Sequence, residues 1–186
     1  AEQLGDKVVI VGTSTGATLS VWLAHQHFTQ NKIHALLFMS PNFKIRNPLG
    51  FLLTWPWAPR WVPLLIGRER TWQPVNELEA KYWTSRYSIQ AVIEMQKTVD
   101  WFRGLDLSSF NIPLATMYMK NDATIDSTAA VRAHEAWGAD KKQLIPVTLD
   151  GEQAQHVFAG DITAPHRVDW CVERFEIFLQ EIDNQG

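Results

Sequence analysis

The strongest constraint on the fold is a strand–turn–helix–strand pattern close to the start of the chain. Residues 7–11 are an apolar, β-branched run that is too short for a helix and is typical of a buried strand. Apolar side chains at helical spacing then follow from Gly16 to Phe28, and a second apolar run covers residues 33–39. Short links between such elements predict two parallel strands joined by a right-handed helical crossover.

The turn between this strand and helix holds a serine between two glycines, Gly12 and Gly16. A Gly-x-Ser-x-Gly turn of this kind exposes the serine oxygen above the end of a sheet. The backbone at Ser14 must then adopt a conformation that is sparsely populated for residues other than glycine. We expect both glycines, which lack Cβ, to let the helix cross close to the strand. The N–H of Thr15, at the start of the helix, is the expected donor to a developing oxyanion.

The rest of the chain continues the alternation of strands and helices. Apolar runs predict strands at residues 113–119 and 144–149, and helical spacing predicts helices over 89–102, 126–137 and 168–182. The chain is therefore predicted to be an α/β protein with a parallel sheet of about four strands and flanking helices. From residue 44 to about 83 the chain is rich in proline and tryptophan, which excludes a central strand or a long helix there.

Composition excludes several classes of partner. A formal net charge of -3 gives no electrostatic reason to expect nucleic acid or an anionic membrane surface. No apolar run is long enough for a transmembrane segment, and the first residues show no signal-peptide pattern. The single cysteine, Cys171, excludes an intrachain disulfide and a multi-cysteine metal site, and it favours a reducing, cytoplasmic location. No residue pattern suggests a metal or another cofactor.

Two further residues complete a candidate constellation around Ser14. A nucleophilic serine needs a base to take its proton and an acid to orient that base. Asp122 follows the third predicted strand and His156 follows the fourth, so both belong to loops beyond the carboxyl ends of parallel strands. Asp126 is a rival acid, although its place before a helix is typical of an N-cap. His166 is a rival base at the start of the final helix.

Residues 12–19, 120–122 and 156–161 together resemble the serine turn, acid loop and histidine loop of the α/β-hydrolase superfamily. The nearest branch is that of capped carboxylesterases and monoacylglycerol-lipase-like enzymes. This resemblance implies that Ser14 is the nucleophile, His156 the general base and acid, and Asp122 the orienting acid. It further implies a serine hydrolase that cleaves a small-molecule carboxylic ester through an acyl-enzyme, without a cofactor.

The resemblance also implies that residues 1–186 are one domain, and that residues 44–104 correspond to the helical cap that the family inserts into it. Its aromatic side chains, among them Phe51, Trp55 and Trp57, are then expected to offer apolar surface to a hydrophobic acyl group. The alternative is that these side chains fill the cap's own core.

The resemblance covers only the C-terminal portion of such a domain, because the family has several strands before the serine. The loop that usually donates a second oxyanion N–H belongs to that earlier part. We therefore expect the chain alone to be poorly active, and strand 7–11 to be an exposed edge that pairs with a second copy in a homodimer. Two alternatives stay open: a thioesterase or acyltransferase on the same triad, and a non-catalytic module that mainly dimerises.

Overall fold

A parallel four-stranded sheet forms the centre of the molecule. The computed structural model describes residues 5–26, 32–148 and 155–184. The strands β1 (Val8–Thr13), β2 (Ile33–Met39), β5 (Leu114–Met119) and β6 (Lys142–Val147) lie in the order β1-β2-β5-β6, and every neighbouring pair is parallel. The predicted parallel sheet is thus confirmed. The carboxyl ends of all four strands lie at the same end of the sheet.

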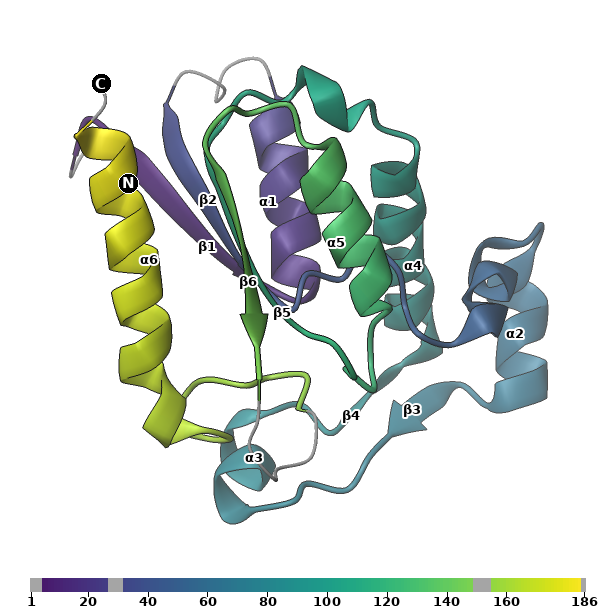
Figure 1. Cartoon of the computed structure of the whole chain (residues 1–186). Helices are drawn as coiled ribbons and strands as arrows, with labels where there is room; N and C mark the ends of the chain where they lie inside the picture. The colour runs from purple at the N-terminus through teal and green to yellow at the C-terminus, as the bar shows by residue number, and fades with distance from the viewer. Residues whose placement is uncertain (1–4, 27–31, 149–154, 185–186) are drawn as a thin grey trace.

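Helices cover both faces of this sheet (Figure 1). Helices α1 (Thr15–His25), α4 (Ile89–Arg103) and α5 (Ser127–Ala136) lie on one side, and α6 (Val168–Asp183) lies on the other. Alternate side chains of β2 enter the two cores: Leu36 and Phe38 pack toward α1, whereas Ala35 and Leu37 pack toward α6. Since both faces are covered, β2 is apolar almost throughout its length.

The strand β6 differs most from its predicted bounds. It runs from Lys142 to Val147 instead of 144–149, and Leu149 lies outside the described residues. Pro146 is within this strand. A proline is tolerated there because β6 is an edge strand, so one of its sides has no neighbour that needs an N–H donor.

The strand β1 forms the opposite edge of the sheet. It pairs only with β2 among the described strands, so one row of its backbone groups faces outward. Its side chains are also poorly covered, and Val11 is 59% exposed. The expected apolar edge is therefore present at this strand.

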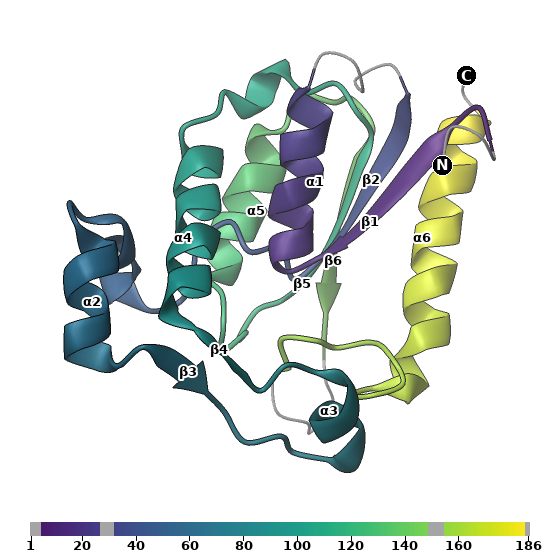
Figure 2. The same ribbon diagram turned by 180° about the vertical axis from the view of Figure 1, so that it is seen from behind.

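Between β2 and α4 the chain leaves the sheet and forms an outlying segment, defined here as residues 48–88. It holds the 3-10 turn η1 (Pro48–Thr54), α2 (Ala58–Ile66), α3 (Glu77–Tyr82), and a two-stranded antiparallel ribbon of β3 (Glu69–Thr71) and β4 (Arg86–Ser88) that was not predicted. Helix α2 packs on α4 and stands far from the sheet, whereas α3 lies beyond the carboxyl ends of the strands (Figure 2). Within the described ranges, no helix is both long and apolar enough to cross a membrane.

Candidate active site

Ser14 occupies the sharp turn between β1 and α1. Its φ of 54° and ψ of -123° are the unusual backbone angles that the sequence predicts. Gly12 allows this turn, because a Cβ there would lie 2.8 Å from Cα of Ala17. At Gly16, by contrast, a Cβ would meet no atom within 4 Å, so the expectation that both glycines permit the close crossing is correct for Gly12 alone.

Asp122 lies in the loop after β5 and is fully buried. Its Oδ1 accepts hydrogen bonds from the N–H of Thr124 at 2.7 Å and of Ile125 at 3.1 Å. Burial by itself raises the pKa of Asp122, but the hydrogen bond and charge of His156, with these two N–H groups, lower the pKa below its ordinary value. The local fold therefore keeps this carboxyl ionised and fixes its orientation.

His156 lies in the loop between β6 and α6, of which residues 149–154 are outside the described part. Two neighbours fix this loop on the sheet. Phe158 is buried in the core beneath α6, and the N–H of Gln155 donates to Sδ of Met119 at 3.0 Å. The Oγ1 of Thr163 also donates to the carbonyl of Val157 at 2.9 Å, which closes the loop beside His156.

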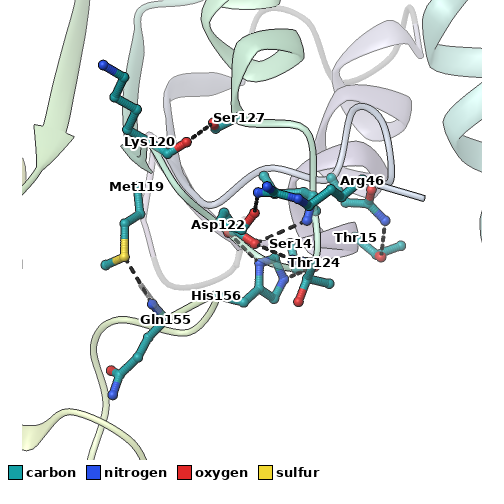
Figure 3. Close-up of polar contacts among 12 residues, drawn as sticks. Ser14, Thr15, Arg46, Met119, Lys120, Asp122, Thr124, Ser127, Gln155 and His156 are labelled. Atoms are coloured by element: carbon teal, nitrogen blue, oxygen red, sulfur yellow. Dashed lines mark hydrogen bonds and ion pairs between the residues drawn. The ribbon is translucent and has the colours of Figure 1, made fainter. Parts of the chain in front are cut away.

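The structure brings Ser14, His156 and Asp122 into one hydrogen-bonded chain (Figure 3). Nδ1 of His156 is 2.8 Å from Oδ2 of Asp122, and Nε2 is 2.7 Å from Oγ of Ser14. Since an ionised carboxylate can only accept, Nδ1 carries the proton and donates to Asp122. Nε2 is then the acceptor for the hydroxyl proton of Ser14, which is the arrangement that a general base requires.

Asp126 and His166, the alternative acid and base, lie elsewhere in the structure. Asp126 is the N-cap of α5, accepts from the N–H of Thr128 at 3.1 Å and pairs with Lys44 at 2.8 Å. Burial raises its pKa, but the hydrogen bonds and charge of these partners outweigh that effect and lower the pKa of Asp126 to about 2. His166 lies in the 3-10 turn η3 (Pro165–Arg167) that precedes α6.

Thr15, the expected oxyanion donor, is the first residue of α1. None of the backbone hydrogen bonds of the described residues involves the N–H of Thr15, as is usual in the first turn of a helix. Its side-chain Oγ1 accepts a hydrogen bond from Nδ2 of Asn42 at 3.2 Å.

A bridging segment, residues 42–46, connects the serine turn to the acid loop and was missed by the sequence reasoning. The N–H of Asn42 donates to the carbonyl of Ser14 at 3.0 Å. Arg46 donates twice to the acid loop, from its N–H to the carbonyl of Thr124 at 3.0 Å and from Nη1 to the carbonyl of Asp122 at 2.5 Å. The signal that could have identified this segment is its position directly after β2, at the same sheet edge as the other loops.

A cavity of about 540 Å³ opens beside His156. The outlying segment and the two loops line it together: Trp72, Val75, Asn76, Glu79, Trp83, Thr124, Gln155, His156, Val157 and Thr163. The structure does not bring Phe51, Trp55 or Trp57 to this cavity. Phe51 and Trp55 contact each other at 5.8 Å between ring centroids, and Trp57 is 74% exposed. The part that these three residues play in substrate binding stays a prediction.

Searches for related sequences found no match. No protein-family model matches the chain, and no curated protein does. Among the residues that the structure describes, no group of three or more His, Cys, Asp and Glu side chains is arranged to hold a metal ion.

Solved structures do match, at low sequence identity. A lipolytic enzyme from the study of the metagenome-derived LipS and LipT superposes with a TM-score of 0.66 at 16% identity, over 97% of this chain and 67% of its own. A monoacylglycerol lipase from Paleococcus ferrophilus gives 0.65 at 16%, over 100% and 71%. A monoglyceride lipase variant from Saccharomyces cerevisiae gives 0.68 at 11%, over 97% and 64%. The chain thus spans about two thirds of these structures, and over that span it has the α/β-hydrolase fold.

Proposed function

We propose that this protein is a serine hydrolase that cleaves carboxylic esters with Ser14, His156 and Asp122 as its catalytic triad. The observation that carries the proposal is the continuous chain of hydrogen bonds from the Ser14 hydroxyl through the imidazole to a buried carboxylate. The backbone angles at Ser14 support it, since they match those of a nucleophile elbow. The structural likeness to lipases and esterases supports the reaction class.

In the first half of the reaction, Oγ of Ser14 attacks the ester carbonyl carbon while Nε2 of His156 takes the hydroxyl proton. The carbonyl oxygen gains negative charge, and the unused N–H of Thr15 at the start of α1 is suited to stabilise it. The carbon–oxygen bond to the alcohol then breaks, and His156 returns the proton to the leaving oxygen. The buried charge of Asp122 stabilises the imidazolium that exists between these two proton transfers.

In the second half, a water molecule attacks the acyl-enzyme and His156 takes its proton. The carboxylic acid is released as the bond to Oγ of Ser14 breaks and the proton passes back to that oxygen. Every proton moves through the same imidazole nitrogen, so the cycle needs neither a metal nor an organic cofactor.

The experiment is labelling with a fluorophosphonate, which reacts only with an activated serine. We expect the parent chain to be labelled and the Ser14→Ala variant to stay unlabelled. Ser20→Ala is the matched control, because the Ser20 hydroxyl is engaged with the carbonyl of Gly16 at 2.7 Å. Equal labelling of the parent and Ser14→Ala, or none of the parent, contradicts the proposal. A panel of matched esters and thioesters with added alcohol acceptors then separates an esterase from a thioesterase or an acyltransferase.

We also propose that residues 44–104 act as a cap and that the substrate carries a hydrophobic acyl group. The support is the apolar surface on this region, where Phe51, Trp55 and Trp57 are all exposed. Trp55→Ala and Trp57→Ala are expected to shift the preference for acyl length across a series of esters. An unchanged profile in both variants contradicts this part of the proposal.

We further propose that a second copy of the chain pairs at the exposed edge of β1. The support is the outward row of backbone groups on this strand, together with exposed Val11 on it and exposed Leu19 and Trp22 on α1. Light scattering at micromolar concentration is expected to show a dimer that the Val11→Lys variant weakens. A strictly monomeric parent contradicts it.

A further inference from the structure

The cavity beside His156 lies on one particular side of the triad. Among the described residues, its lining includes His156 but neither Ser14 nor Thr15. In the proposed reaction, His156 gives its proton to the oxygen of the departing alcohol, so the alcohol portion of an ester must approach the imidazole. The acyl portion stays bonded to Ser14. The cavity is therefore placed to receive the alcohol portion.

A buried carboxylate lines this cavity. Glu79, in the first turn of α3, is only 5% exposed, and its Oε2 accepts a hydrogen bond from the N–H of Val75 at 2.9 Å. Among the described residues no Lys, Arg or His forms an ion pair with it, and it is the single acidic residue of the cavity lining. Buried carboxylates are normally paired with a cation, because removal from water is costly. The negative charge of Glu79 is thus not balanced by any cation of the described residues.

Two tryptophans line the same cavity as this carboxylate. Trp72 and Trp83 are both half-buried in the cavity wall, and their rings meet edge to face at 6.1 Å between centroids. The indole N–H of Trp72 donates to the carbonyl of Thr84 at 3.2 Å, which fixes its ring. Tryptophan faces attract organic cations through the ring quadrupole, most strongly where water is excluded.

We propose that this cavity binds an alkylammonium group on the alcohol portion of the substrate, with Glu79 as the counter-charge and Trp72 and Trp83 as aromatic walls. The assignment of the cavity to the alcohol portion rests on the proposed ester hydrolysis. The cation site itself rests on the unpaired carboxylate and the two indoles. A neutral polyol and a plain apolar alcohol are the competing occupants, and the experiment separates them from the cation.

The kinetic test compares two esters with the same acyl group, one of choline and one of its neutral isostere 3,3-dimethylbutanol. We expect kcat/KM to favour the choline ester by about tenfold, because a desolvated cation–π contact and a buried counter-charge contribute only to that ester. A glycerol ester with the same acyl group tests the polyol. Equal values for choline and 3,3-dimethylbutanol, or a preference for the neutral isostere or for glycerol, overturn the proposal.

Glu79→Gln is the informative variant, since the amide oxygen can still accept from the N–H of Val75 while the charge is lost. It is expected to lower kcat/KM for the choline ester by about tenfold and to lower that for the 3,3-dimethylbutyl ester much less, so that the preference for choline is lost. Glu77→Gln is the matched control, because Glu77 is an exposed residue of the same helical turn and does not line the cavity. An equal loss for both esters in Glu79→Gln indicates a purely structural role and overturns the proposal.

A binding measurement separates failure of the cation site from failure of the proposed function. The indole N–H resonances of Trp72 and Trp83 are assigned with Trp72→Phe and Trp83→Phe, and the parent is titrated with tetramethylammonium chloride against sodium chloride. Saturable shifts that vanish in Glu79→Gln support the site, and their absence in the parent overturns it. If no ester is hydrolysed and fluorophosphonate leaves Ser14 unlabelled, the proposed function is wrong, and the titration alone decides the cation site.

Discussion

The two regions that meet at His156 are held in place in different ways. At the carboxyl end of the sheet, three loops are fixed by short hydrogen bonds between segments far apart in the chain, such as those that Asp122 accepts from Arg46 and from His156. The outlying segment packs through a small core that Val62 of α2 shares with Ile93 of α4, and many of its apolar side chains are exposed. We infer that the proposed chemistry belongs to the sheet and its hydrogen-bonded loops, called the rigid region below, whereas the outlying segment is suited to selection of the substrate.

The largest expected effect comes from Asp122→Asn at the sheet edge. This change removes the charge that stabilises the imidazolium and favours the wrong tautomer of His156. We expect kcat to fall on the order of 10³- to 10⁴-fold on any ester that the parent cleaves. Asp126→Asn is the control, because Asp126 caps α5 and does not contact His156. A loss below tenfold in Asp122→Asn, or an equal loss in both variants, contradicts the division between the regions.

The close crossing at Gly12 predicts the largest effect on stability. A valine there meets the backbone of Ala17 and the side chain of Ser20 below 3.0 Å, so strand and helix must move apart. We expect Gly12→Val to lower the free energy of unfolding by about 3 kcal/mol or more, measured by urea denaturation. Gly16→Ala, where a Cβ meets open space, is expected to be neutral or slightly stabilising. Equal denaturation midpoints for the two variants contradict this reading of the turn.

Buried His134 makes the stability of the rigid region depend on pH. Burial, with a smaller effect of nearby Lys142, lowers the pKa of His134 to about 4 from 6.5. The unfolded chain therefore binds the proton more readily, so stability is complete above pH 6.5 and falls as the pH drops toward 4. Between pH 7 and pH 5 this one group accounts for a loss of about 2 kcal/mol in the free energy of unfolding.

The measurement is urea denaturation of the parent and of His134→Gln at both pH values. The glutamine can keep a hydrogen bond to the Thr116 hydroxyl, which lies 3.0 Å from Nδ1 of His134. The variant is expected to show a flatter dependence on pH. An equally steep loss of stability in His134→Gln indicates that other groups set the acid sensitivity.

The smallest expected effect concerns Arg46, whose side chain supports the acid loop from the bridging segment. Arg46→Ala removes the donor to the carbonyl of Asp122, and we expect kcat to fall about tenfold with KM little changed, since the residue does not line the cavity. Arg46→Lys is expected to restore part of the rate. Arg103→Ala, which removes an exposed arginine of α4, is the control. A change in KM alone would indicate that Arg46 contributes to substrate binding, as proposed for the outlying segment, and not to the acid loop.

The sequence predicts the rigid region well because its signals are local. Short apolar runs define β2 within its observed bounds, and the positions of Asp122 and His156 after strands predict that they meet Ser14 at one sheet edge. It predicts the outlying segment poorly, because proline and tryptophan indicate irregular structure without showing which side chains face inward. Trp72 and Trp83 line the cavity and Trp57 does not, although nothing in the composition of this segment distinguishes the three tryptophans. The contacts of Arg46 were equally hidden, since they join residues that are far apart in the chain.

One hydrogen bond between the regions has a consequence for how this molecule can change. Nδ2 of Asn76, at the start of α3, donates to the carbonyl of Ile162, and the next residue, Thr163, closes the loop that carries His156. A substitution that enlarges the cavity by shifting α3 is therefore expected to displace the loop of His156, the imidazole of the proposed triad, as well. For the proposed hydrolase, a broader substrate range is thus expected to lower the turnover, and a variant selected for a bulkier alcohol is expected to need a second change near Ile162 to recover its rate.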